Sequence, residues 1–141
     1  MKQEIDLLTF YPQSKRPIEE RAHLIQESDR AKARKFDKDY FDGDRLSGYG
    51  GYSYHPRFWT ETVKFIADFY NLSNDSKILD IGCAKGFMMH DLSLILPEAE
   101  IIGIDVSSYA KKHAKAEVKE NIYLGSANNL PFQDSYFDLV I

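Results

Sequence analysis

Short apolar runs alternate with helical patterns over the second half of the chain. The apolar runs are residues 78–81, 101–104, 122–124 and 137–141. Each is short enough for a strand, and stretches with the period of a helix separate them at 87–96 and 107–118. Strands that alternate with helices predict β-α-β units and a parallel sheet, and continuous apolar runs are typical of strands buried on both faces.

The first half is more polar and less regular. Residues 1–16 show no period, whereas the stretch 17–38 is rich in Glu, Arg, Lys and Ala and has few apolar positions. This stretch predicts one solvated helix that acts as a lid or flank rather than as a core element. Glycines and tyrosines at 42–55 predict a loop, and the apolar positions of 55–70 predict an amphipathic helix.

Size and composition restrict the class of protein. The chain of 141 residues fits one domain, 46–141, with a helical or irregular flank, 1–45. A net charge of −4 without a basic cluster argues against a nucleic-acid partner. Apolar runs are far shorter than the roughly 18 residues of a membrane helix, and the chain starts without the apolar segment of a signal peptide. A single cysteine excludes an intrachain disulfide, so we expect a cytoplasmic protein without a membrane partner.

The most informative stretch for chemistry runs from Lys77 to Phe87. A strand ends there, small residues make a tight turn, and a helix begins, so backbone amides and the positive end of a helix dipole face the ligand. Asp80 would repel a pyrophosphate but would suit a cationic group, such as the ammonium of a methionine moiety. The small positions Gly82, Ala84 and Gly86 also depart from the dinucleotide-binding spacing. The alternative role for Asp80 is to cap the amides of the loop.

A second acidic residue ends the next strand. Asp105 follows the glycine loop by about 20 residues, where a carboxylate can accept hydrogen bonds from ribose hydroxyls. Its alternative role is to cap the helix that begins near Ser107. The loop 125–132 follows the third strand and can lie against an adenine ring, with hydrogen bonds from Asn128 or from the backbone of Ala127.

These motifs, in this order, resemble the class I S-adenosylmethionine-dependent methyltransferases. Residues 80–86 match the family's acidic residue and glycine loop, with alanine at the middle glycine, and Asp105 matches its ribose acid. Residues 125–132 match its G-D-A-x-x-L-P-F loop, except that Ser126 replaces the aspartate, and 137–140 match its F-D-x-V strand. The resemblance implies S-adenosylmethionine as the cofactor. It assigns to the cofactor Asp80, Gly82, Cys83, Ala84, Gly86, Asp105, Val106, Ala127 and Asn128.

The loop of tyrosines and glycines adds two candidates. Tyr49 is expected either to pack the flank onto the sheet or to close over the methionine end of the cofactor. Arg57 can pair with the methionine carboxylate. This region, with the His-Pro-Arg-Phe-Trp run that begins at His55, is also similar to methyltransferases of sugar and cell-surface polysaccharide pathways.

The predicted fold is a Rossmann-like, doubly wound parallel sheet that is incomplete, because the family has seven strands and this chain supplies the first four. We therefore expect a C-terminally truncated methyltransferase whose strand at 137–141 is covered by a second copy or a crystal neighbour. The predicted reaction is methyl transfer to a small-molecule or sugar-type acceptor, with no assigned catalytic residue and no metal. The alternatives are an inactive S-adenosylmethionine-binding scaffold and an NAD-dependent oxidoreductase.

Overall fold

The structure is a computed structural model that describes residues 4–13 and 16–141. Its first half contains four helices: α1 (Ile18–Leu24), α2 (Glu27–Ala33), α3 (Lys38–Asp42) and α4 (Pro56–Phe69). The second half alternates strands with helices: β1 (Lys77–Ile81), α5 (Phe87–Ile95), β2 (Glu100–Asp105), α6 (Ser108–Lys112), the short helix η1 (Lys119–Asn121), β3 (Ile122–Leu124) and β4 (Leu139–Val140). The predicted strands and the helices at 55–70 and 87–96 are therefore confirmed within a few residues at each end.

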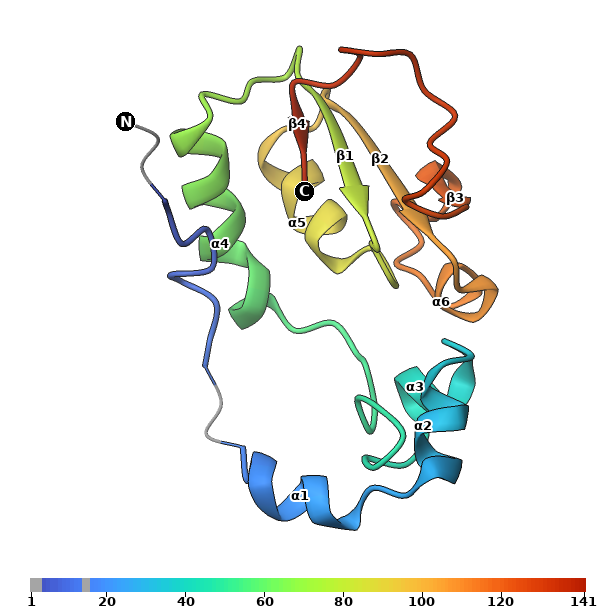
Figure 1. The fold of residues 1–141 in the computed structure, drawn as a ribbon. Helices are drawn as coiled ribbons and strands as arrows, with labels where there is room; N and C mark the ends of the chain where they lie inside the picture. Colours follow the sequence, from blue (N-terminus) through green and yellow to red (C-terminus); the bar gives the residue numbers. More distant parts are fainter. Residues whose placement is uncertain (1–3, 14–15) are drawn as a thin grey trace.

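The four strands form one parallel sheet in the order β3-β2-β1-β4. The chain moves from β1 outward through β2 to β3 and then returns to the other side of β1 (Figure 1). In the register of β1 with β2, Asp80 lies opposite Gly103, and Asp105 comes two positions later. The predicted Rossmann-like parallel sheet is confirmed, and the carboxyl ends of β1 and β2 bring both acidic candidates to one edge.

The main core lies between the sheet and the helices α4 and α5. Val63, Met89 and Leu92 are fully buried there. Gly103 of β2 leaves room for α5, because a Cβ atom at this position would lie 2.5 Å from the sulfur of Met89 and 2.6 Å from the sulfur of Cys83. Close packing of α5 onto the sheet fixes the direction from which its N-terminus meets the glycine loop.

The single helix predicted at 17–38 is wrong, because the chain forms α1 and α2 with a break at residues 25–26. Gln26 adopts an extended conformation and caps α2, and its N–H donates a 3.0 Å hydrogen bond to Asp29. None of the described residues of either helix is buried. Without an apolar face that packs against a core, a local capping box decides where the helix starts.

The helix predicted at 107–118 is also wrong in length, because α6 ends at Lys112. The N–H of Lys115 donates a 3.0 Å hydrogen bond to the carbonyl of Lys85, in the glycine loop, in place of a helical bond. The chain then turns so that Val118 is buried in the main core. A tertiary partner therefore replaces the local helical pattern at this point.

The helices α1, α2 and α3 of the flank, and the loop after them, extend beyond the carboxyl ends of the strands, whereas residues 4–13 lie beside α4, where Phe10 contacts Phe65. Figure 1 shows α1, α2, α3 and the loop that leads to α4 on the side of the sheet toward which β1 points. Within the described parts of the chain, no helix combines the length and apolar character needed to cross a bilayer. The flank lies where a ligand at the edge of the sheet would be covered.

Candidate cofactor site and a neighbouring cavity

The glycine loop has the backbone geometry that its sequence predicts. Gly82, Ala84 and Gly86 all have positive φ values, of 79°, 50° and 72°. A Cβ atom at Gly82 would meet nothing within 4 Å, so the space beside its backbone is open. A Cβ atom at Gly86 would lie 2.8 Å from Val118, so this glycine serves packing, and it also caps the start of α5.

Asp105 connects the glycine loop to the end of β2. One carboxylate oxygen accepts a 2.7 Å hydrogen bond from the N–H of Ala84, and the other accepts a 2.8 Å bond from the N–H of Ser107. Ser107 caps α6 through its hydroxyl, so the alternative role of Asp105 as the direct helix cap is not what the structure shows. Each carboxylate oxygen keeps a second lone pair for a further donor.

Asp80 lies under the loop and is 6% exposed. Among the described residues, none donates a hydrogen bond to its carboxylate, so the alternative role as a cap of the loop amides is not observed. Burial, with a smaller contribution from the negative charge of Asp105, raises the pKa of Asp80 to about 7. A cationic group near Asp80 would favour its charged form.

A cavity of about 360 Å³ opens above the loop at the carboxyl edge of the sheet. Three segments that are distant in sequence line it: Gly82 and Ala84, Asp105 and Val106, and the stretch 125–127. Val106 is 58% exposed and presents an apolar surface to this cavity. The flank adds Phe36, Tyr40 and Phe41 to the lining, and the loop after it adds Tyr49.

Several predicted cofactor residues lie outside this cavity. Asn128 is exposed, and its N–H donates to the hydroxyl of Ser126. Cys83 is buried against Gly103, and burial raises the pKa of its thiol above the usual range. Arg57 is at the first turn of α4 and lines a different cavity. The structure therefore separates Arg57 from Asp105, which the sequence had placed in one site.

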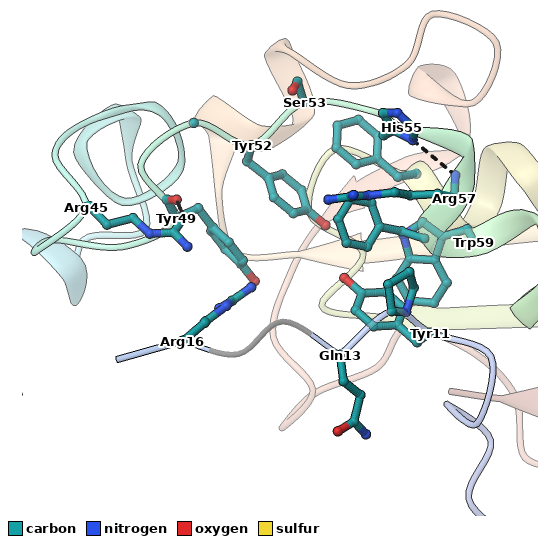
Figure 2. Close-up of a pocket in the computed structure, with 14 residues that line it drawn as sticks. Tyr11, Gln13, Arg16, Arg45, Tyr49, Tyr52, Ser53, His55, Arg57 and Trp59 are labelled. Carbon is teal, nitrogen blue, oxygen red and sulfur yellow. Dashed lines mark hydrogen bonds between the residues drawn. The ribbon is translucent and has the colours of Figure 1, made fainter. Parts of the chain in front are cut away.

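The neighbouring cavity has a volume of about 400 Å³ and is lined by tyrosines, tryptophan and arginines (Figure 2). Tyr49 borders both cavities, so they are adjacent. Tyr52 lines this neighbouring cavity and stacks on Phe87, the residue that follows the glycine loop, with ring centroids 4.8 Å apart. The tyrosine-rich loop therefore both packs the flank onto the domain and forms walls of the two cavities.

Two buried polar contacts hold this loop, and the sequence pattern did not reveal either. A lysine is usually exposed to solvent, yet Lys85 is 6% exposed and donates hydrogen bonds of 2.7–2.9 Å to both oxygens of Asp42 and to the carbonyl of Tyr52. The hydroxyl of Tyr54 donates to Asp91, which is 2% exposed. Tyr54 therefore points into the fold.

The Lys85–Asp42 ion pair contributes to a lowered pKa of Asp42. Burial alone raises the pKa of Asp42, but hydrogen bonds from Lys85, from the N–H of Tyr52 and from the hydroxyl of Tyr109 outweigh that effect and lower the pKa to about 2. One carboxylate thus joins α3 to the glycine loop, to the tyrosine-rich loop and to α6.

The parallel sheet, the glycine loop that leads into a helix, and the acid that ends the second strand define a Rossmann-like domain for a nucleoside cofactor. Comparison with known families gives the class. Residues 79–141 match the family described as "Methyltransferase domain". This match and the fold support a class I methyltransferase, and they confirm S-adenosylmethionine as the predicted cofactor.

Known proteins with similar sequences carry related names. The chain is 34% identical over 106 residues to a demethylmenaquinone methyltransferase of Lactococcus lactis subsp. lactis, covering 70% of this chain and 40% of that protein. It is 35% identical over 68 residues to a malonyl-[acyl-carrier protein] O-methyltransferase of Legionella pneumophila subsp. pneumophila, covering 45% of this chain and 24% of that protein. The chain therefore spans less than half the length of these relatives.

A solved structure described as MccD protein has a similar fold. It superposes with a TM-score of 0.50 at 26% identity, covering 55% of this chain and 37% of that one.

Proposed function

We propose that this chain forms the cofactor-binding portion of an S-adenosylmethionine-dependent methyltransferase that acts on a small-molecule acceptor, including acceptors of the sugar type. One observation carries the proposal: the glycine loop, the end of β2 and the loop after β3 converge on one cavity at the carboxyl edge of the sheet. Ligands of open α/β sheets bind at this edge, where the strand order reverses. Here the order reverses beside β1.

The residues of the cavity fit the parts of this cofactor. Asp105 has lone pairs for ribose hydroxyls, and its bonds to Ala84 and Ser107 hold it in place. Val106 and Ala127 offer small apolar surfaces for the adenine ring. The open space beside Gly82 lets the ligand approach the backbone. Asp80 does not line the cavity, but it lies two residues before Gly82 and would provide a negative charge for the ammonium of the methionine end.

When bound, the cofactor supplies a methyl group on a positively charged sulfur, which a nucleophilic oxygen, nitrogen or carbon can attack. The residues of this chain would hold the two reactants in the right geometry, and such positioning accounts for much of the rate of these transfers. Tyr49 separates the cofactor cavity from the larger cavity next to it, and Tyr52 covers Phe87 at the start of α5. We propose that the larger cavity receives the acceptor.

Calorimetric titration with S-adenosylhomocysteine and with NAD tests the assignment. We expect binding of S-adenosylhomocysteine and none of NAD. Asp105→Asn should weaken S-adenosylhomocysteine at least about tenfold, because hydrogen bonds to a charged group contribute about 1.5–3 kcal/mol. Asp134→Asn, which changes an exposed carboxylate, is the matched control. Heat with NAD alone, or an unchanged affinity in a folded Asp105→Asn variant, would contradict the proposal.

A further inference from the structure

The larger cavity is strongly cationic. Its described walls contain three arginines, Arg16, Arg45 and Arg57, and one histidine, His55, but no aspartate or glutamate. This is unusual in a chain with 22 acidic and 18 basic residues. Arg57 comes from the start of α4, Arg45 from the tyrosine-rich loop and Arg16 from the segment before α1, so three separate segments bring positive charge to one space (Figure 2).

Arg57 is oriented to bind an anion. Its guanidinium lies over the ring of Phe58, 4.6 Å from the ring centroid. Among the described residues, none accepts a hydrogen bond from this guanidinium, whereas the guanidinium of Arg45 donates to the carbonyl of Tyr49. Figure 2 shows the Arg57 side chain extending across the cavity toward Tyr52. Stacking occupies the face of the guanidinium and leaves its N–H edge for a carboxylate or phosphate.

Aromatic rings make up most of the remaining wall. They are Tyr11, Tyr49, Tyr52, Phe58, Trp59 and Phe87. Tyr11 contacts both Phe58 and Trp59, with ring centroids 5.3 Å and 5.0 Å apart, so this part of the wall is held in place. Faces and edges of aromatic side chains favour a flat, unsaturated ring as the partner.

We infer that this cavity binds an acceptor that combines an aromatic ring with an anionic group, a carboxylate or a phosphate, and that Arg57 holds the anionic group. Its description as the acceptor rests on the proposed function. The rival reading is that Arg57 binds the carboxylate of the cofactor itself. Arg57 lines this cavity and not the one that Asp105 lines, which favours a separate anionic ligand.

The test uses two probes that share the same ring and differ in their charge and polar group, 2-naphthoate and 2-naphthalenemethanol. Each is titrated calorimetrically into the 141-residue chain, alone and saturated with S-adenosylhomocysteine. We expect the acid to bind at least about tenfold more tightly than the alcohol, with a preference that falls as salt rises. Glucuronate, an acid on a saturated sugar ring, should bind more weakly than 2-naphthoate.

Variants of Arg57 test whether this residue causes the preference for 2-naphthoate over the alcohol. Arg57→Gln should remove the preference for the acid and leave the affinity for S-adenosylhomocysteine within about twofold. Arg57→Lys should keep only part of the preference for the acid, because an ammonium lacks the two-pronged geometry of a guanidinium. Lys64→Gln removes the same charge from an exposed position on α4 and should change nothing.

Three results would overturn the inference. The first is equal binding, or no binding, of the naphthalene acid and alcohol. The second is a loss of S-adenosylhomocysteine affinity in Arg57→Gln with 2-naphthoate unaffected, which would give Arg57 to the cofactor. The third is tighter binding of glucuronate than of 2-naphthoate, which removes the aromatic part. Failure of the proposed function gives a different result, since the chain would then bind no S-adenosylhomocysteine whatever the probes do.

Discussion

Two carboxylates near the glycine loop have different environments and so different chemistry. Asp105 accepts hydrogen bonds from two backbone N–H groups, those of Ala84 and Ser107. Asp80 is buried without such donors among the described residues, and the charge of Asp105 opposes its ionisation. Burial therefore favours the neutral form of Asp80, and a cationic group beside it would favour the charged form.

The pH dependence of stability tests this description of Asp80. Its pKa is about 7 in the folded chain against an ordinary value of 3.8, so the folded state holds a proton that the unfolded state has lost. The free energy of unfolding should therefore fall as pH rises from about 4 to about 7. Asp80→Asn should flatten that decline in urea denaturation, whereas exposed Asp134→Asn should not. An unchanged slope in Asp80→Asn would assign the effect to other groups.

At the scale of elements, the Lys85–Asp42 ion pair joins α3 and the tyrosine-rich loop to the α/β core. Lys85 also donates to the carbonyl of Tyr52, and its own carbonyl accepts from the N–H of Lys115. The aromatic contacts between Phe41, Tyr49 and Tyr52 continue the same attachment. Lys85 is thus one of several residues that hold the walls of both cavities, together with these aromatic contacts and the hydrogen bond from Tyr109 to Asp42.

Lys85→Met keeps most of the side-chain volume and removes the charge, leaving Asp42 without its cation. We expect a loss of about 1.5–3 kcal/mol in the free energy of unfolding or in local opening, and faster amide hydrogen exchange across residues 43–55. The affinity for S-adenosylhomocysteine should fall with it. Lys112→Met, at an exposed position of α6, is the control. Unchanged exchange in the loop would show that the aromatic contacts alone hold it.

Acid should also loosen the loop in the native chain, because it protonates Asp42. Because the pKa of Asp42 is lowered to about 2 from 3.8, its contribution to stability is present above about pH 4 and is lost as the pH falls toward 2. Exchange of the loop amides should therefore accelerate in that acid range in the native chain more than in Lys85→Met.

At the scale of the whole molecule, the sheet has β3 at one edge and β4 at the other among the described residues. Val140 of β4 is 52% exposed, and Ile141 continues the pairing with β1, because its carbonyl accepts from the N–H of Ile81 and its N–H donates to the carbonyl of Leu79. An unprotected edge that exposes an apolar residue is a surface on which another strand can pair. This edge is the origin of the predicted association of two copies.

We expect the 141-residue chain to self-associate with rising concentration in sedimentation experiments. Val140→Lys should shift it toward the monomer, because a lysine on an edge strand opposes strand pairing. Leu94→Lys, at an exposed apolar position of α5, should leave association unchanged. A chain that stays monomeric at all concentrations would remove the edge as an interaction surface.

The sequence by itself determined the order of strands and helices in the α/β half and the position of the glycine loop between β1 and α5. Both are local: apolar runs define the strands, and Gly82 and Gly86 at turns with positive φ define the loop. Asp105 was predictable for the same reason, because its place at the end of a strand follows from the chain alone.

Only the tertiary structure decided where α6 ends, which way Lys85 points and which cavity Arg57 lines. In each case the partner is distant in sequence: Lys115 bonds to the loop at Lys85, and Lys85 bonds to Asp42. A local pattern gives the polarity of a side chain but not the element that packs against it. That packing buried a lysine, a residue that is usually exposed to solvent, and it set Arg57 apart from the cofactor cavity.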